Sequence, residues 1–115
     1  RNYRSAEARI DYTLKDGTQT WQPTFTFMGY RYARVTITGE AKVTAIESVP
    51  ITSVPGRKAT FTSGHALVNR LVENTLWSLR SNFIEVPTDC PQRDERLGWT
   101  GDAQVFAGTA CWLAD

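Results

Sequence analysis

The feature that most constrains this chain is a change in the spacing of its apolar residues about halfway along its 115 residues. In the first half apolar and polar residues alternate, as at Ala33, Val35 and Ile37, which is the period of a strand with one buried face. In the second half apolar residues such as Leu67 and Leu71 recur at the three- and four-residue spacing of a helix face. Two blocks with different periods predict a β part followed by an α part.

Residues 1–53 are predicted to be the C-terminal part of an antiparallel β-sandwich domain, in a chain of the α+β class. Polar turns such as Lys15-Asp16-Gly17 separate short alternating runs, as in hairpins. Alternating aromatics such as Trp21 are expected in the core of this sheet. A complete sandwich has about seven strands, and here we expect only four, over residues 8–14, 21–27, 30–37 and 41–49.

Residues 54–63 are predicted to form a linker with a short strand, and a helix is expected over residues 64–82 with Ser63 as its cap. A second helix should begin at Thr100 or Gly101 and run to the end of the chain. It is apolar on nearly every side, so it needs neighbours all around it. This sequence does not supply them. We therefore expect a fragment of a larger protein; the alternative is a small protein that self-associates through the second helix.

The overall composition excludes several classes of partner. The chain carries 13 basic and 12 acidic residues, which leaves no basic patch for nucleic acid or an anionic membrane. No apolar run is long enough to span a bilayer. Cys90 and Cys111 are expected to be free thiols and, with His65, make a poor zinc set. We therefore expect no metal and no cofactor, and the cysteine usage slightly favours a cytoplasmic location.

A loop over residues 87–102, PTDCPQRDERLGWTGD, concentrates the charged groups of the second half. Two prolines and two glycines disfavour a regular helix or strand through it. Acids beside an aromatic are typical of a sugar-cleaving site, but also of an ion-paired turn. For each residue considered alone, a structural role such as an ion pair or a turn is a better explanation than a role in catalysis or sugar binding. The residues concerned are the carboxylates Asp89, Asp94, Glu95 and Asp102, the arginines Arg93 and Arg96, expected to hold the carboxylates in place, and Trp99.

The run TDCPQRDERLGWTGDA resembles the signature of the bacterial α-L-rhamnosidases of glycoside hydrolase family 78. Upstream, FTFMGYRYARVTITG resembles the strand that ends the β-sandwich domain before that family's catalytic barrel. HALVNRLVENTLWSLRSNF resembles the helix that leads into the barrel. The resemblance implies that residues 64–115 are the opening helices and acid-bearing loop of an (α/α)6 catalytic domain.

The same resemblance implies an inverting hydrolase that removes terminal α-L-rhamnose from rhamnose-containing glycosides or polysaccharides. It assigns Glu95 as general acid and Asp89, Trp99 and Asp102 as the groups that bind the rhamnosyl unit. Inverting hydrolysis needs a second carboxylate to activate water. In the family this base is a glutamate much further along, beyond Asp115, so the fragment alone is expected to be inactive.

Two hypotheses from other classes stay open at this point. The aromatics of the first half could form a sugar-binding module without chemistry. Alternatively, the apolar second helix could make the chain a structural piece that drives assembly.

Overall fold

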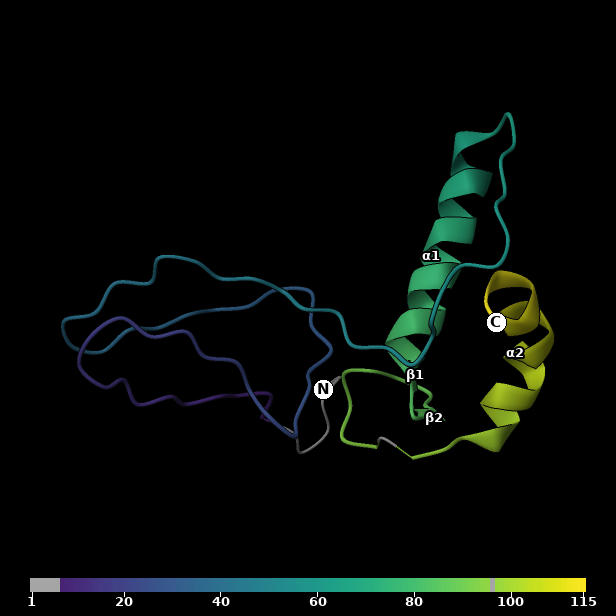
Figure 1. The fold of residues 1–115 in the computed structure, drawn as a ribbon. Coiled ribbons are helices and arrows are strands. Elements are labelled where there is room, and N and C mark those ends of the chain that lie inside the picture. Colours follow the sequence, from purple (N-terminus) through teal and green to yellow (C-terminus); the bar gives the residue numbers. More distant parts are fainter. Residues whose placement is uncertain (1–6, 96) are drawn as a thin grey trace.

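The computed structural model describes residues 7–95 and 97–115, and within them it contains two helices separated by a short hairpin and a loop (Figure 1). Residues 1–6, where the predicted sandwich part begins, and Arg96 lie outside the described residues. Both predicted helices are present, close to their expected bounds. The elements in order are α1 (Ala66–Asn82), β1 (Phe83–Ile84), β2 (Val86–Pro87) and α2 (Thr100–Leu113).

The first half contains none of the four expected sandwich strands within its described residues 7–53. The alternating side chains that were expected to share a buried face are instead exposed. Trp21 is 45% exposed and Tyr32 is 86% exposed. A strand holds its shape only when its backbone is paired and one face is covered. Among the residues described, no second layer covers a face of this half outside residues 27–29, and the core expected for its aromatics is not formed.

Two turns of this half are nevertheless formed. Gly17 and Gly39 adopt φ of 89° and 90°, a left-handed conformation that glycine adopts without a steric penalty. Across the Gly17 turn, the rings of Tyr12 and Trp21 stack with centroids 4.7 Å apart. Figure 1 shows the result as long extended loops, drawn in purple and blue, that project away from the helices.

The start of α1 differs from the prediction in how it is capped. Its N-cap is His65, not Ser63, and no side chain caps it directly. Ser63 instead exchanges hydrogen bonds with Asn69 in the first turn: the Ser63 N–H donates to Asn69 Oδ1 (2.8 Å) and Asn69 Nδ2 donates to the Ser63 carbonyl (3.0 Å). The Ser63 hydroxyl accepts the His65 N–H at 3.2 Å. The helix entry is therefore held by a side chain inside the helix.

Ser53 and the start of the predicted linker are hydrogen-bonded to the β1–β2 hairpin and to the end of α2. The Ser53 N–H donates to the Phe83 carbonyl (2.8 Å), and the Ser53 hydroxyl accepts the Glu85 N–H (2.8 Å). Further along, the Lys58 N–H donates to the Leu113 carbonyl at 2.9 Å. Backbone groups of residues 53–58 are thus paired with β1 at one end and with the C-terminal end of α2 at the other.

A small core lies where α1, β1 and α2 meet. Leu76 and Leu79 of α1 are each 2% exposed and pack with Ala114. Phe106 of α2 meets the Phe83 ring edge-on, with centroids 6.4 Å apart. The half-buried side chains that pack against this core are Val54, Phe83, Phe106, Ala110 and Leu113.

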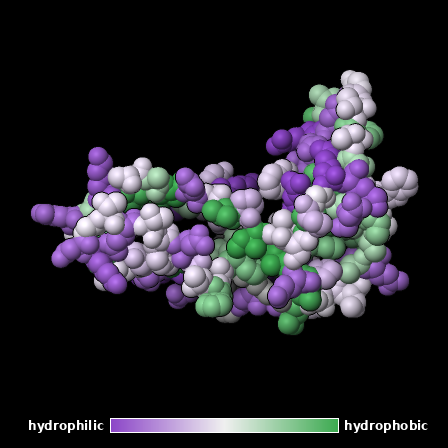
Figure 2. All heavy atoms as spheres, viewed as in Figure 1, coloured by the Kyte–Doolittle hydropathy of each residue, from purple (hydrophilic) through white to green (hydrophobic). Residues whose placement is uncertain are grey.

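Within the described residues helix α2 is covered on one side only, as expected for an apolar helix whose neighbours this sequence does not supply. Val105 is 88% exposed and Trp112 is 78% exposed. The physical reason is that α1 and the linker can cover only one face. Figure 2 shows apolar surface in the middle of the visible face and polar side chains at the outer end of the first half. Among the described residues no helix combines the length and apolar character needed to cross a membrane.

Candidate functional site

The loop that carries the predicted site residues leaves and re-enters the fold at β2. Asn82, the last residue of α1, accepts two hydrogen bonds at its carbonyl, from the Thr88 N–H (2.8 Å) and the Thr88 hydroxyl (3.1 Å). At the other end the Trp99 N–H donates to the Pro87 carbonyl at 3.2 Å. Residues 88–98 are therefore a closed loop between the end of α1 and the start of α2.

Within this loop the structure brings Asp89, Cys90 and Glu95 together. One oxygen or sulfur atom from each lies within 4.8 Å of the others. The Cys90 thiol donates to Asp89 Oδ1 at 3.3 Å. Arg93 Nη1 lies 3.4 Å from Glu95 Oε1, and the Glu95 side chain is only 7% exposed. Arg93 thus holds a carboxylate in place, as the sequence predicts.

Within this cluster the pKa values of Asp89 and Cys90 are shifted in opposite directions. Burial raises the pKa of Asp89, but hydrogen bonds from Glu95, Cys90 and its own backbone N–H, together with the Arg93 charge, outweigh burial and leave the pKa below its usual value. Burial raises the pKa of the Cys90 thiol, and its hydrogen bond to Asp89 raises it further. Asp89 is therefore the ionised acceptor of the cluster, and Cys90 is a protonated donor.

These three groups are also the ones within the described residues that could approach a metal ion together. A thiol binds a metal as its thiolate. In the structure the Cys90 thiol donates a hydrogen bond to Asp89.

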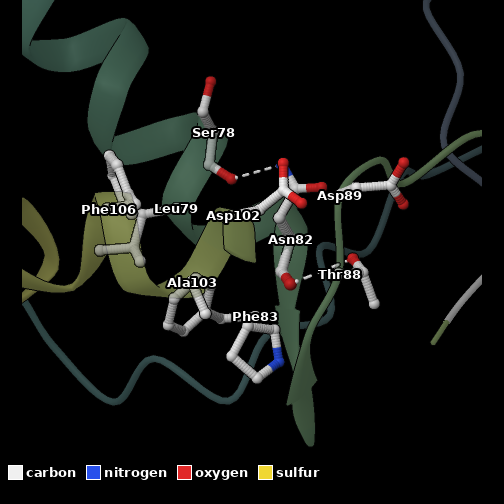
Figure 3. A pocket seen from close by; sticks show the side chains of 10 residues that line it. Ser78, Leu79, Asn82, Phe83, Thr88, Asp89, Asp102, Ala103 and Phe106 are labelled. Carbon is white, nitrogen blue, oxygen red and sulfur yellow. Dashed lines mark hydrogen bonds between the residues drawn. The ribbon is translucent and has the colours of Figure 1, made fainter. Parts of the chain in front are cut away.

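A pocket of about 200 Å³ lies beside this cluster, between α1 and α2 (Figure 3). Asp89 and Asp102, two of the predicted sugar-binding residues, both line it. In Figure 3 the Asp89 carboxylate points away from Asp102, toward the other side of its loop. Glu95 and Trp99 are not among the residues that form the pocket wall, and Trp99 is 41% exposed. Asp89 therefore lies next to Glu95 in the loop cluster and lines the pocket together with Asp102. The four predicted site residues, Trp99 included, do not share one cavity.

Sequence reasoning did not identify the residues of α1 that complete this pocket. Asn82 is the most informative, because within the described residues its buried Oδ1 has no hydrogen-bond partner. Its Nδ2 donates to the Ser78 carbonyl at 2.9 Å, which directs the amide into the wall of the pocket (Figure 3). The sequence signal that could have identified Asn82 is its position: it is a polar residue at the end of the helix that precedes the acid-rich loop. The full lining is Ser78, Leu79, Asn82, Phe83, Pro87, Thr88, Asp89, Asp102, Ala103 and Phe106.

The plain structural role of Asp102 is also present. Asp102 lies in the first turn of α2, where a negative charge is favourable to the helix dipole. Thr100 is the first helical residue, one of the two predicted starts, and Trp99 is the N-cap. Asp102 is exposed, so helix stabilisation and ligand contact are compatible uses of the same carboxylate.

The two cysteines should differ sharply in their rate of alkylation. Both are free, Cys90 is buried and 6% exposed, and Cys111 is exposed. Only an accessible thiolate reacts, so the burial of Cys90 and its raised pKa both slow the alkylation of Cys90. We expect iodoacetamide to label Cys111 first and Cys90 slowly, as followed by mass spectrometry of the two peptides. Similar rates for both thiols in the folded chain would contradict the packing described for the loop.

Two family models match the sequence, and together they cover nearly all of it. The bacterial alpha-L-rhamnosidase 6 hairpin glycosidase domain matches residues 56–115, which include both helices and the acid-bearing loop. The bacterial alpha-L-rhamnosidase concanavalin-like domain matches residues 1–54. The two matched ranges meet at the linker.

Individual relatives agree with these matches. An alpha-L-rhamnosidase of Formosa agariphila is 46% identical over 99% of this chain and 13% of its own length. One from Streptomyces avermitilis is 47% identical over 99% of this chain and 11% of its own length. One from an Alteromonas species is 42% identical, again over 99% of the chain and 13% of the relative. The chain thus spans only a small part of these relatives. No solved structure matches it.

Proposed function

Because this chain belongs to the bacterial alpha-L-rhamnosidase family, we propose that it supplies the acid side of the active site of an inverting α-L-rhamnosidase. The observation that carries the proposal is the placement of the Asp89 and Glu95 carboxyl groups within 4.8 Å of each other, with the Glu95 side chain 7% exposed and held by Arg93. The substrates are glycosides or polysaccharides that end in α-L-rhamnose. Residues 1–53 and 64–115 belong to different domains, with residues 54–63 as the linker.

Glu95 is the general acid in this proposal. A carboxyl group can donate a hydrogen bond to another carboxyl group only while it carries a proton. The pKa of Asp89 is lowered, which makes Asp89 the ionised partner. A general acid gives a proton to the leaving oxygen of the glycoside, and Glu95, whose side chain is 7% exposed and lies beside Asp89, is the carboxyl group assigned to that step.

Asp89, Trp99 and Asp102 bind the rhamnosyl group. A carboxylate accepts several hydrogen bonds, so each aspartate can contact adjacent sugar hydroxyls. The pocket that Asp89 and Asp102 line has a volume of about 200 Å³, below the range of about 300–1,000 Å³ of drug-sized ligand sites, a size that matches a single sugar ring better than a larger ligand. The exposed Trp99 ring offers a flat apolar surface for the C–H face and the methyl group of a deoxysugar.

The general base is a carboxylate outside these 115 residues. Inversion requires two carboxyl groups about 6.5–9.5 Å apart with a water between them. The cluster within the described residues is tighter, since its groups lie within 4.8 Å of one another. Asp89 is therefore assigned to binding and not to activation of water.

The complete enzyme should hydrolyse an aryl α-L-rhamnoside and release β-L-rhamnose first. Proton NMR within the first minutes, before the sugar mutarotates, identifies the anomer. The 115-residue chain, assayed alongside as a control, should show no turnover above background. Release of α-L-rhamnose would contradict the inverting mechanism. Turnover by the isolated chain would show that no carboxylate outside it is needed.

A further inference from the structure

One short run in the first half of the chain is shielded from solvent. Across the described residues 7–53 nearly every side chain is exposed, and residues 27–29 form the one consecutive run that is half-buried. This run, Phe27-Met28-Gly29, lies far in sequence from the helices and from the acid-bearing loop. For Gly29, the last residue of this run, the neighbouring atoms lie outside the first half.

At Gly29 the neighbouring group is the backbone of the acid-bearing loop. A Cβ built on Gly29 would lie 2.6 Å from the Pro91 carbonyl carbon, 2.7 Å from the Pro91 oxygen and 2.8 Å from the Gln92 nitrogen. Carbon atoms in contact are normally about 3.5–4.0 Å apart. Figure 1 shows this arrangement, with the blue segment of the first half lying beside the yellow-green loop. The two backbones meet at a distance that only glycine permits.

The contact lies inside the segment that carries the carboxylates. Pro91 follows Cys90, which is 6% exposed and hydrogen-bonds to Asp89. Glu95 comes three residues after Gln92. A displacement of the Pro91–Gln92 peptide would therefore change how Asp89 and Glu95 face each other.

We propose that Gly29 is a positioning residue for this loop: its missing side chain lets the first half press against Pro91 and Gln92 and so hold Glu95 at its working position. The structural part of this inference stands on the contact itself. The part that concerns Glu95 as proton donor rests on the function proposed above.

Gly29→Ala isolates this contact from other effects. The φ of Gly29 lies outside the left-handed region, so alanine can adopt the same backbone conformation. The added methyl group must instead move the two backbones about 1 Å apart to reach a normal contact distance. Gly56→Ala is the matched control, because Gly56 also lacks a left-handed φ and a Cβ there meets nothing within 4 Å.

In the complete enzyme Gly29→Ala should lower kcat for methyl α-L-rhamnoside about 100-fold, the scale expected for a misplacement near 1 Å. KM should change far less. Hydrolysis of 2,4-dinitrophenyl α-L-rhamnoside should fall only a few-fold, because its leaving group needs little protonation, and this activity also shows that the variant is folded. Gly56→Ala should behave as wild type. Equal losses on the two substrates, or no loss relative to Gly56→Ala, would overturn the positioning role.

A second measurement tests the contact without reference to activity. In the 115-residue chain Gly29→Ala should raise the rate of Cys90 alkylation at least several-fold, because the displaced loop exposes the neighbouring thiol, while Cys111 keeps its rate. Unchanged Cys90 labelling would refute the contact. Faster labelling combined with a wild-type enzyme that does not cleave rhamnosides would support the contact and reject the proposed function, so the two failures can be told apart.

Discussion

Glu95→Gln in the complete enzyme should lower the turnover of alkyl rhamnosides by about 10²–10⁴-fold, the usual contribution of a general acid. Glutamine has nearly the same shape and can still accept a hydrogen bond from Arg93 at the position that Glu95 Oε1 occupies. What it lacks is a proton that can be transferred to the leaving oxygen. The loss should therefore appear in kcat and not in KM.

The dependence on the leaving group identifies the lost step. An alkoxide leaves only with a proton, whereas a dinitrophenolate leaves as an anion, so the 2,4-dinitrophenyl substrate should lose much less. Asp94→Asn is the matched control, because Asp94 is the adjacent carboxylate and is exposed. It should retain near wild-type rates on both substrates. If Glu95→Gln lost the same factor on both, Glu95 would not be the acid.

Leu79→Ala should remove about 2–5 kcal/mol from the free energy of unfolding, the cost of truncating a buried leucine. Leu79 is 2% exposed and packs in the core at the junction of α1, β1 and α2. Its removal leaves a cavity that few neighbours can fill, because the core is small. Urea titration of the 115-residue chain, followed by circular dichroism at 222 nm, measures the loss.

Leu67→Ala on the same helix is the control for Leu79→Ala. Leu67 is 75% exposed, so its truncation should change stability by no more than about 0.5 kcal/mol. Both changes have the same effect on helix propensity, and the difference between them reports packing alone. Equal effects of the two substitutions would mean that the contact between α1 and α2 does not contribute to stability.

The helices could be predicted from the sequence because the signals that define them are local. The three- and four-residue spacing that includes Leu76 and Leu79 depends only on the helical turn, and these two residues became the core of the molecule. The loop was recognisable from its prolines, glycines and concentrated acids. Its ion pair between Arg93 and Glu95, two residues apart, followed from the same local pattern.

The strands could not be predicted from local signals in the same way. Alternation around Val35 and Ile37 indicates which side chains would share a face, but a ladder also requires a partner strand and a covered face. The turns at Gly17 and Gly39 needed only local conformation, and they formed. The ladders between them needed long-range pairing, and within the described residues of the first half they are not present.

By itself, the sequence determined the positions of the two helices, the loop between them and the set of acidic residues that the loop carries. Each of these depends on residues a few positions apart. The tertiary structure alone decided that Asp89 contacts Glu95 while sharing a pocket wall with Asp102, that Asn82 completes that wall, and that Gly29 touches Pro91. The physical reason is that close packing between distant segments depends on how the whole chain folds back on itself, and no periodicity along the sequence encodes that distance.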